Sequence, residues 1–422
     1  MVLKVFEAFS GVGSQRMALR NLGVDYEVVA TSEIDDFAVK SYAAIHDNNK
    51  VVPEETVENM EAYLKKRNIP LNKDGARKNL RGKRLKEFYE ACVKSNNLGD
   101  ISKVDTQDIP DHDLFTYSFP CQDISVAGKG LGLDEGGGTR SGLLWECQKV
   151  IAGKKPKYLL LENVKNLVGK KHKPNFDKWL EWLEGQGYTN YWEVLNAKDF
   201  GIPQNRERVF VVSILGEHKP YVFPSKEKLI LRLKDILEDE VDEKYYLDDE
   251  KTEKLIATFT DVKDIEQQEG LKMNRNKVSR KTDVAQTLLA RDYKGFGNQD
   301  MNGVIEPMIA ASRGRNSNNP SDRTPGSPTE QRLEINRNGT SNTITTVQKD
   351  NYVIEPNNLK HTDYRIRKLT PKECWRLMGF SDDDFHKAEE VNSNTQLYKQ
   401  AGNSIVVTVL EAIFKQLLET VN

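Results

Sequence analysis

The sequence predicts an α/β protein in which a mostly parallel β-sheet carries helices on both faces and a smaller domain of short strands and loops follows. Apolar, strand-like runs alternate with helical patterns from residue 2 to residue 214, which is typical of a parallel sheet. Residues 271–356 are instead rich in Asn, Gly, Ser, Thr and Arg and show few helical periods. A chain of 422 residues is long enough for roughly two or three domains.

The expected strands and helices alternate along the first half of the chain. Strands are expected at 2–9, 26–31, 114–118, 158–161 and 209–214; helices are expected after residue 14, at 36–46, at 143–151 and at 176–186. In sheets of this kind ligands bind at the carboxyl ends of the strands. Candidate functional residues are therefore those that directly follow each strand.

A glycine turn, FSGVGS at 9–14, follows the first expected strand and opens a helix. Its glycines let a ligand approach the backbone, and the helix N-terminus offers N–H donors. Arg16 occupies the place of the third glycine of a dinucleotide fingerprint, which favours a nucleoside over a pyrophosphate. Glu33 ends the second strand about 20 residues further on, where an acid can bind ribose hydroxyls. For the turn alone, a plain structural turn is the alternative.

Three more motifs follow strand ends or lie beside them. Cys121 follows a strand in SFPCQDIS, and the Gly-rich stretch 128–142 after it is typical of an active-site lid, which favours a nucleophile over a buried thiol. Glu162 in LLLENVKNL suits either an acid–base partner or a helix-start acid. Arg206 and Arg208 in PQNRERVF share one face, which suits an anion, a carbonyl or a surface ion-pair strand.

Two motifs near the carboxyl end predict helices. In RKLTPKECWRLMGF, Thr370 is the expected N-cap, Pro371 is the first helical residue and Glu373 is the acid of a capping box. QAGNSIVVTVLEAIF at 400–414 is a polar turn that leads into an apolar helix. Taken singly, both motifs are mostly structural signals.

Targeting and redox features point to the cytoplasm. No apolar run reaches the ~18 residues of a membrane span, and the N-terminus has no signal-peptide layout. The four cysteines, Cys92, Cys121, Cys147 and Cys374, lack the spacing of a zinc site or of a disulfide scaffold. We therefore expect a reduced, cytoplasmic protein without a membrane span or a metal.

The charge of the chain is balanced overall but uneven along its length. Lys and Arg number 62 and Asp and Glu number 64, and the formal charge of −2, taken alone, argues against general binding of polyanions. Residues 65–94 are strongly basic, residues 226–269 are acidic, and residues 271–356 have a mild basic excess. Contact with nucleic acid is expected to depend on these local patches, and the basic insert 65–94 is either such a contact or a solvated face.

Taken as an ordered set, the motifs resemble the DNA (cytosine-5) methyltransferases. The matching blocks, in order, are FEAFSGVGS, Glu33, GDI, SFPCQDIS, ENV, QNRER, RKLTPKECWRLMGF and QAGNS. The resemblance implies an S-adenosylmethionine-dependent methyltransferase (Rossmann-like) fold: a mixed sheet with helices on both faces, plus a smaller, strand- and loop-rich target-recognition domain. It implies a catalytic and cofactor-binding domain at 1–220, a target-recognition domain at 225–395, and a C-terminal helix at 396–422 that returns to the catalytic domain.

The resemblance also implies a chemistry. Cys121 would add to a cytosine that has been flipped out of the duplex, Glu162 would hydrogen-bond N3 and the amine, and Arg208 would hold the O2 carbonyl. Arg206 would support the loop or a phosphate, and S-adenosylmethionine would leave as S-adenosylhomocysteine; the base that removes the C5 proton is not assigned. The expected cofactor-binding residues are Phe9, Gly11, Gly13, Glu33, Ile34, Asp100, Ile101, Pro120, Leu143, Asn403 and Ser404.

Double-stranded DNA is the partner that the resemblance implies, for a monomer in restriction-modification or phage DNA protection; a cognate restriction endonuclease stays open. TYSFPCQDIS and TRSGLLWE are similar to bacterial enzymes that methylate CpG, but the recognition segment does not follow them, so the target sequence stays open. Candidate base readers or phosphate contacts are Arg291, Asn298, Gln299, Arg313, Arg315, Arg323, Gln331 and Arg337.

Three alternatives are weaker. A tRNA cytosine methyltransferase usually lacks so long a recognition segment and carries a Cys-Phe-Thr signature that is not found here. A catalytically silent relative is expected to lose Cys121 or Glu162, and both are present. A nicotinamide dehydrogenase is disfavoured by Arg16 in place of a glycine.

Overall fold

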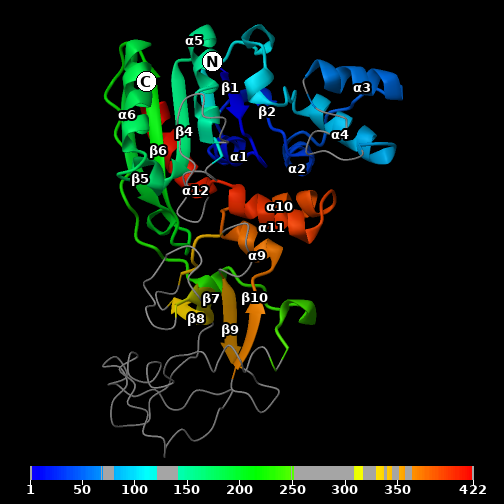
Figure 1. Ribbon diagram of the computed structural model, residues 1–422, viewed down its shortest axis with the longest axis vertical. Coiled ribbons are helices and arrows are strands. Elements are labelled where there is room, and N and C mark those ends of the chain that lie inside the picture. Colours follow the sequence, from blue (N-terminus) through cyan, green and yellow to red (C-terminus); the bar gives the residue numbers. More distant parts are fainter. Residues whose placement is uncertain are drawn as a thin grey trace, which may run out of the picture. The chain divides into compact units, whose positions relative to one another are not determined.

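The computed structural model describes residues 2–67, 69, 80–120, 141–248, 250, 308–316, 329–336, 340–344, 351–356 and 364–420 (Figure 1). The chain forms two compact units. Unit 1 comprises Met1–Arg232, Thr343–Val347 and Pro371–Asn422, and unit 2 comprises Leu233–Asn342 and Gln348–Thr370. The expected recognition domain ran from 225 to 395, whereas residues 371–395 lie in unit 1, where they pack against its helices.

Unit 1 is built on a six-stranded mixed sheet of order β2-β1-β3-β4-β6-β5. Its strands are β1 (Leu3–Ala8), β2 (Tyr26–Ser32), β3 (Leu114–Tyr117), β4 (Tyr158–Val164), β5 (Tyr188–Asn196) and β6 (Glu207–Leu215). β1 to β4 are parallel to their neighbours, and β6 runs antiparallel to both β4 and β5. The predicted α/β fold is confirmed. The edge strand β5 was not predicted, because polar residues interrupt its apolar ones and most of its side chains are half-exposed or exposed.

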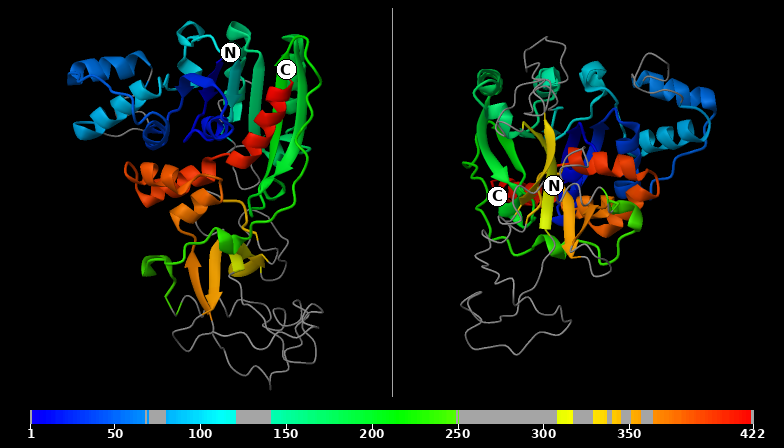
Figure 2. Two further views of the ribbon diagram at one scale, coloured as in Figure 1. Left: turned by 180° about the vertical axis from the view of Figure 1, so that it is seen from behind. Right: turned by 60° about the horizontal axis from the view of Figure 1, so that its bottom comes forward.

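Helices cover both faces of this sheet (Figures 1 and 2). On one face, α5 (Cys147–Lys154) and α6 (Lys173–Gly185) pack on an apolar cluster that includes Phe6, Phe115 and Trp179. The other face carries α1 (Ser14–Asn21), α2 (Asp36–His46) and α12 (Val407–Glu419). α1 and α12 pack together there, and Tyr42 of α2 donates a hydrogen bond to Glu7 of β1. Alternate side chains of β1 therefore serve different helices.

The basic insert contains two helices, α3 (Val57–Lys66) and α4 (Lys83–Lys94). They share a small apolar cluster with α2, which contributes Val39 and Ala43 beside Met60, Leu64 and Phe88 of the insert. α4 also packs on α2, and the chain then returns to the sheet where Asn97 bridges to Thr31 of β2. The insert therefore packs its apolar side chains against α2 and is anchored beside the carboxyl end of β2.

The carboxyl-terminal helices complete unit 1. They are α9 (Pro371–Arg376), α10 (Asp382–Glu389), α11 (Asn394–Asn403) and α12. α9 begins at Pro371, as predicted. Among the described residues, the stretch Asn394–Glu419 is long and apolar enough for a membrane span by length and composition alone, which the sequence did not suggest. It breaks between α11 and α12 and is 56% buried, which is the behaviour of core helices in a folded unit.

Unit 2 contains a four-stranded antiparallel sheet of order β10-β9-β7-β8. The strands are β7 (Met308–Arg315), β8 (Glu330–Asn336), β9 (Tyr352–Pro356) and β10 (Tyr364–Lys368). A small core forms on one face from Ala310, Leu333, Ile354 and Ile366. Short strands were expected in this part of the chain, and the described strands agree with that expectation.

Candidate active site

The carboxyl ends of β1, β2, β3 and β4 lie at the same edge of the sheet, because these four strands are parallel. β6 is antiparallel and therefore begins at that edge, where Arg208 pairs with Val164 of β4. The topology thus gathers four sequence-predicted groups that are distant in the chain: the glycine turn, Glu33, Glu162 and Arg208.

The two glycines of the turn after β1 have different surroundings. Both have positive φ, at 54° for Gly11 and 85° for Gly13, so an L side chain is disfavoured at either position. A Cβ on Gly13 would lie 2.4 Å from Nε2 of His46, whereas a Cβ on Gly11 would meet nothing within 4 Å. Gly13 is therefore required by packing, and Gly11 leaves open space where a ligand can approach the backbone.

Glu33, at the end of β2, is held by three backbone N–H groups. Its Oε1 accepts from Ile34 (2.7 Å) and Asp35 (2.8 Å), and its Oε2 accepts from Gly11 (3.0 Å). Burial raises the pKa of this carboxyl above its ordinary value, and the backbone donors counteract that rise. The Ile34 side chain is 57% exposed. The Glu33 carboxylate, which can accept a hydrogen bond from a ligand hydroxyl, therefore lies beside the exposed apolar side chain of Ile34.

Asp100 lies three residues after Asn97, the residue that bridges to Thr31 of β2. Its Oδ1 accepts from the Ser102 N–H (3.1 Å) and hydroxyl (2.8 Å), and Oδ2 lies 3.7 Å from Nζ of Lys103. Ile101 follows it in a 3-10 turn and is buried in the apolar core. Asp100 keeps 27% of its side chain exposed, so it can accept a hydrogen bond from an external group.

Glu162 and Arg208 form the centre of the site. Nε of Arg208 lies 3.3 Å from Oε1 of Glu162, and their side chains are 17% and 10% exposed. Burial raises the pKa of Glu162, while Arg208 and then Arg206 lower it. A nearly buried carboxyl of raised pKa can carry a proton to higher pH than an exposed one.

Cys121 lies outside the described residues, but the strand end that leads to it is described. Nδ2 of Asn163 donates to the carbonyl of Phe119 (2.9 Å), and Oδ1 of Asn163 accepts from the N–H of Val164 (2.8 Å). Asn163 is 2% exposed. It therefore ties the end of β4 to the residues just before Cys121, a role that its place in the ENV block did not suggest.

Arg206 is buried and holds main-chain carbonyls from two other segments. Its Nη1 donates to Ile344 (2.7 Å), and its Nη2 donates to Gly402 (3.1 Å) and Ser404 (2.7 Å). The sequence suggested support of the loop or a phosphate contact. The observed contacts hold the turn between α11 and α12, and the guanidinium is enclosed by carbonyls and is only 4% exposed.

Gln204 of the same motif acts beside Arg206. It is fully buried, its Nε2 donates to the carbonyl of Leu377 (2.6 Å), and its Oε1 accepts from the N–H of Ile344 (2.8 Å). The sequence assigned it no role, although its place in the QNRER block was the only available signal. Gln204 and Arg206 together anchor Ile344, which belongs to unit 1 although unit 2 segments flank it in sequence.

The other expected cofactor residues occupy four places in the chain. Phe9 packs against the apolar core and has a φ of 54°, and Leu143 lies in a 3-10 turn, Ser141–Leu144. Asn403 is exposed, whereas Ser404 is 8% exposed and donates its hydroxyl to the carbonyl of Gln400. Pro120 is half-buried at the end of the strand segment. Of these residues, Ser404 already donates its hydroxyl to a main-chain carbonyl of α11.

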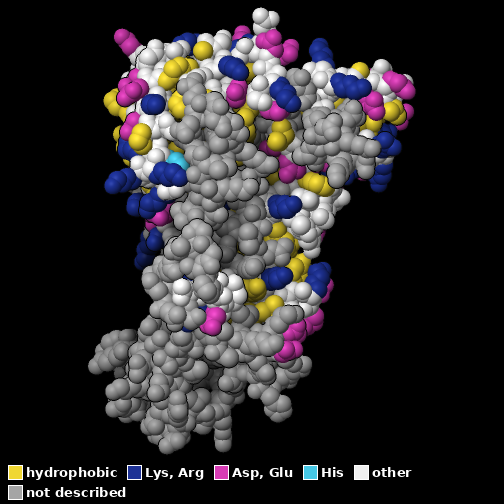
Figure 3. Space-filling model, viewed as in Figure 1, with side chains coloured by type: hydrophobic (Ala, Val, Ile, Leu, Met, Phe, Trp, Pro, Cys, Tyr) yellow, Lys and Arg dark blue, Asp and Glu magenta, His cyan; other side chains and the backbone are white. Residues whose placement is uncertain are grey.

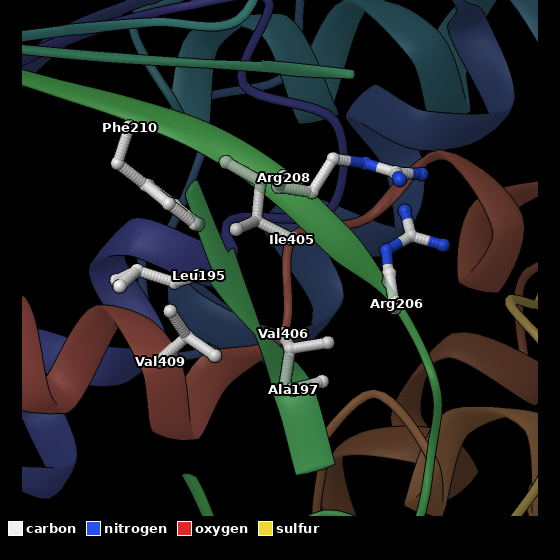
Figure 4. A pocket seen from close by; sticks show the side chains of 8 residues that line it. All are labelled: Leu195, Ala197, Arg206, Arg208, Phe210, Ile405, Val406 and Val409. Atoms are coloured by element: carbon white, nitrogen blue, oxygen red, sulfur yellow. The ribbon is translucent and has the colours of Figure 1, made fainter. Parts of the chain in front are cut away.

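A shallow recess of roughly 190 Å³, open side included, lies next to the two arginines (Figure 4). Its lining consists of Leu195, Ala197, Arg206, Arg208, Phe210, Ile405, Val406 and Val409. The guanidinium groups of Arg206 and Arg208 lie beside one another on one side, while Phe210, Leu195 and Val409 form an apolar wall. The recess belongs to the same edge of the sheet as Glu162.

A buried polar network of α1, α2 and β1 side chains lies against the glycine turn. Arg16 of α1 donates to both carboxylate oxygens of Asp47 (2.7 and 2.9 Å), and Tyr42 donates to Glu7 (2.6 Å). His46 donates from Nε2 to the carbonyl of Val12 (3.1 Å). Arg16, which replaces the third glycine of a dinucleotide fingerprint, is thus bonded to the C-terminal end of α2, a contact that the sequence did not predict.

Only some of the candidate DNA-contacting residues lie among the described residues of unit 2. Arg315 forms a two-point ion pair with Glu334, and Oγ of Ser312 donates to Oε1 of Gln331 (3.2 Å). Arg313 is 44% exposed and lies 3.8 Å from the same Glu334. The candidates Arg291, Asn298, Gln299, Arg323 and Arg337 lie outside the described residues.

Basic side chains of the insert lie close to acidic ones. Lys65 lies 3.7 Å from Glu61, Lys83 lies 3.7 Å from Glu87, and each pair is four residues apart on one helix. Charges of both signs are interspersed over this part of the surface (Figure 3). The described part of the chain contains no group of three or more His, Cys, Asp or Glu residues that could hold a metal ion.

Comparisons with known proteins agree on one family. The family model described as C-5 cytosine-specific DNA methylase matches residues 72–419. The chain is 41% identical to the type II methyltransferase M2.ScrFI of Lactococcus lactis subsp. cremoris, over 99% of this chain and 100% of that protein. It is 32% identical to the orphan methyltransferase M.SPRI of Bacillus phage SPR, over 99% of this chain and 98% of that one.

Solved structures share the fold. The S. pombe Dnmt2 methyltransferase matches with a TM-score of 0.56 at 18% identity, over 100% of this chain and 99% of that one. The Entamoeba histolytica methyltransferase EhMeth matches with a TM-score of 0.57 at 16% identity, over the same shares. With the family match over most of its length, the chain belongs to the C-5 cytosine-specific DNA methylases and is a DNA (cytosine-5) methyltransferase.

Proposed function

We propose that this protein transfers a methyl group from S-adenosylmethionine to C5 of a cytosine flipped out of a specific duplex DNA sequence, with Cys121 as the nucleophile. The observation that carries the proposal is the convergence of two half-sites on one edge of the sheet. One is the Glu162–Arg208 pair, and the other is Glu33 with the open backbone of Gly11. Family membership supports the reaction, and this convergence supports the assignment of the residues.

The first half-site suits the adenosine part of the methyl donor. A carboxylate oxygen has two acceptor sites, so Oε2 of Glu33, which accepts one hydrogen bond from Gly11, retains one for a ribose hydroxyl. The exposed Ile34 side chain can cover an apolar ring, and Asp100 can accept from an adenine amine. When bound, S-adenosylmethionine supplies an activated methyl group on a sulfonium sulfur.

The second half-site suits cytosine. The Cys121 thiolate forms a bond to C6, and Glu162 donates a hydrogen bond or a proton at N3, so that electron density builds up at C5. Burial raises the pKa of Glu162 above its ordinary value, which supports this role because the carboxyl then keeps its proton to higher pH than an exposed one. Arg208 donates to the O2 carbonyl, where charge develops. After C5 has taken the methyl group, a base that is not assigned removes the C5 proton, Cys121 is eliminated from C6 and Glu162 takes back the proton at N3, which restores the aromatic ring.

Other residues act through these groups. Asn163 fixes the carbonyl of Phe119 and thereby the approach of the chain to Cys121. Arg206 holds the carbonyls of Gly402 and Ser404, which orders the turn that contains Asn403. Both are positioning residues, since their hydrogen bonds are made to main-chain carbonyls.

Unit 2 is the proposed target-recognition domain, and duplex DNA is the proposed partner of a monomeric, cytoplasmic enzyme. Support comes from the exposed Arg313 on β7 and from relatives named as a type II methyltransferase and a phage orphan methyltransferase. These names favour a role in restriction-modification or in protection of phage DNA.

The deciding experiment incubates the purified full-length protein with tritiated S-adenosylmethionine and either unmethylated duplex DNA or tRNA. We expect the label in duplex DNA, and methyl sequencing of DNA from expressing cells then gives the target sequence. Label in tRNA with none in duplex DNA would overturn the proposal.

A further inference from the structure

β2 is the edge strand of the unit 1 sheet, and residues 95–99 lie along its free side. Thr31 pairs with Asn97 in a parallel bridge, and the N–H of Leu98 donates to the carbonyl of Thr31 (2.8 Å). This segment carries the chain from α4 to Asp100. This pairing brings the turn that leads to Asp100 to the end of β2, although the whole basic insert separates Asp100 from Glu33 in sequence.

The Asn97 side chain is fully buried and uses both ends of its amide on Glu33. Its Oδ1 accepts from the N–H of Glu33 (2.9 Å), and its Nδ2 donates to the carbonyl of Glu33 (3.0 Å). The same Oδ1 accepts from the N–H of Gly99 (3.3 Å). One amide thus fixes the backbone of Glu33 and the turn that leads directly to Asp100.

We propose that Asn97 is a positioning residue for the methyl donor, which sets the spacing between Glu33 and Asp100. This inference rests on the proposed function, in which Glu33 binds the ribose and Asp100 binds the adenine amine. Asn97 lies behind both residues and is buried, so it acts through them and makes no contact with the cofactor.

The chemistry of the site requires an amide at this position. Glu33 presents one donor and one acceptor of its backbone to Asn97, and only a side chain with both an acceptor and a donor satisfies the two. Aspartate would place a second oxygen against the Glu33 carbonyl and leave that carbonyl without its donor. Because a buried backbone group without a partner is costly, Glu33 would shift away from its present position.

Asn96 provides a matched control. Its Nδ2 donates to the carbonyl of Val29 in the same strand (2.8 Å), and its Oδ1 accepts from Arg67 (3.3 Å). It therefore makes a similar side-chain bond to the β2 backbone but at a residue four positions before Glu33. Asn96→Asp removes one such bond, and aspartate tolerates the positive φ of 44° at this position.

The test compares Asn97→Asp, Asn97→Ser and Asn96→Asp with the wild-type full-length protein. We expect both Asn97 variants to raise KM for S-adenosylmethionine and Kd for S-adenosylhomocysteine by about tenfold or more, with kcat at saturating cofactor within about threefold. Asn96→Asp should leave these constants within about twofold of wild type. Serine keeps a small hydroxyl at the site, so it provides a second measurement if the aspartate variant does not fold.

A second measurement separates positioning from general loss of structure. The 2′-deoxy analogue of S-adenosylhomocysteine lacks one ribose hydroxyl. If Asn97 acts through Glu33, the Asn97 variants should therefore raise the Kd of this analogue by a smaller factor than the Kd of S-adenosylhomocysteine. Equal penalties for both ligands, equal effects of Asn96→Asp, or unchanged KM in the Asn97 variants would overturn the inference. Failure of the wild-type protein to bind S-adenosylhomocysteine would instead contradict the proposed function itself.

Discussion

Arg206 and Ser404 are joined by a hydrogen bond of 2.7 Å from the buried guanidinium to the main-chain carbonyl of Ser404. The same guanidinium also donates to the carbonyls of Gly402 and Ile344. Arg208, two residues further along the chain, points instead to the carboxylate of Glu162. Two arginines of one motif therefore have different partners: Arg206 orders the backbone around the site, and Arg208 pairs with the carboxylate that is proposed to face the base.

Arg206→Lys should lower both stability and cofactor affinity. A lysine offers a single nitrogen and cannot reach three carbonyls from two segments, so buried carbonyls lose their donors. We expect the free energy of unfolding to fall by about 3 kcal/mol and KM for S-adenosylmethionine to rise by about tenfold. Denaturant unfolding and steady-state kinetics measure the two effects.

Arg208→Lys is the control variant for Arg206→Lys. It should lower kcat and leave KM for S-adenosylmethionine and the free energy of unfolding close to wild type, because Arg208 contacts a side chain and not the turn before α12. Matching profiles for the two lysine variants would contradict the separate roles.

Cys121→Ala should abolish methyl transfer without loss of DNA binding. The thiolate is the proposed nucleophile, and alanine cannot form the bond to C6, while the recognition surface is unchanged. Methyl transfer and an electrophoretic binding assay on the same duplex measure the two properties. Transfer at the wild-type rate by this variant would remove Cys121 from the mechanism.

Glu162→Gln should lower kcat by about a hundredfold and retain binding of DNA and cofactor. Glutamine can donate a hydrogen bond but cannot release a proton. Because burial raises the pKa of Glu162, the protonated carboxyl persists to higher pH, and the wild-type rate should decrease as pH rises through that pKa. The glutamine variant should lack this decrease, and a pH profile of kcat that is identical in both proteins would argue against proton donation.

Glu7 and His46 should give opposing pH effects on stability. Burial raises the pKa of Glu7 from 4.5 to about 7, so the stability that its proton provides is complete below pH 4.5 and is lost by about pH 7. Burial lowers the pKa of His46 from 6.5 to about 3, so stability falls as pH drops from 6.5 to about 3. Between pH 4.5 and 6.5, the loss of stability from Glu7 with rising pH is nearly balanced by the gain from His46.

Glu7→Gln separates these contributions. Tyr42, Arg16 and Asp47 surround this network and remain in the variant, so the difference in unfolding free energy between wild type and Glu7→Gln isolates the carboxyl. That difference should decrease by about 3 kcal/mol from pH 4.5 to pH 7. A difference that is constant over this range would show that Glu7 titrates normally.

The residues that follow parallel strands could be predicted from the sequence, because strand ends in such a sheet share one edge. Glu33 and Glu162 illustrate this: each follows an apolar run that is visible without a structure. Arg206 and Arg208 were also found, since they alternate in one motif. Their different roles could not be predicted, because the partners of Arg206 are main-chain carbonyls, which no side-chain pattern marks.

Contacts between distant segments account for most of what the sequence did not predict. Asn97 lies in a polar stretch that carries no motif, and its partner Glu33 is 64 residues away. Asn163 was part of a recognised block, yet its bond to Phe119 depends on the neighbouring positions of β3 and β4. Such roles follow from strand order, which local periodicity does not determine.

The lysines at the start of α4, Lys83 and Lys86, should contribute little to DNA binding, because each already lies near an acidic side chain. Lys83 is 3.7 Å from Glu87, and Lys86 is 4.0 Å from Glu90 and 3.7 Å from Glu54. Each lysine that binds a DNA phosphate adds about 1 to the slope of log K against log salt concentration. Replacement of Lys83 and Lys86 by Gln should therefore leave this slope unchanged within about 0.5.

Arg313→Gln in unit 2 is the comparison for this prediction. Arg313 is 44% exposed, and its acidic neighbour Glu334 is already engaged by Arg315, so its charge is available to a phosphate or a base. This variant should reduce the salt slope by about 1. The two slopes can be measured by titration of one fluorescent duplex at several salt concentrations. A larger loss for the double lysine variant than for Arg313→Gln would make the insert a DNA-binding surface, with its ion pairs exchanged for phosphate contacts on binding.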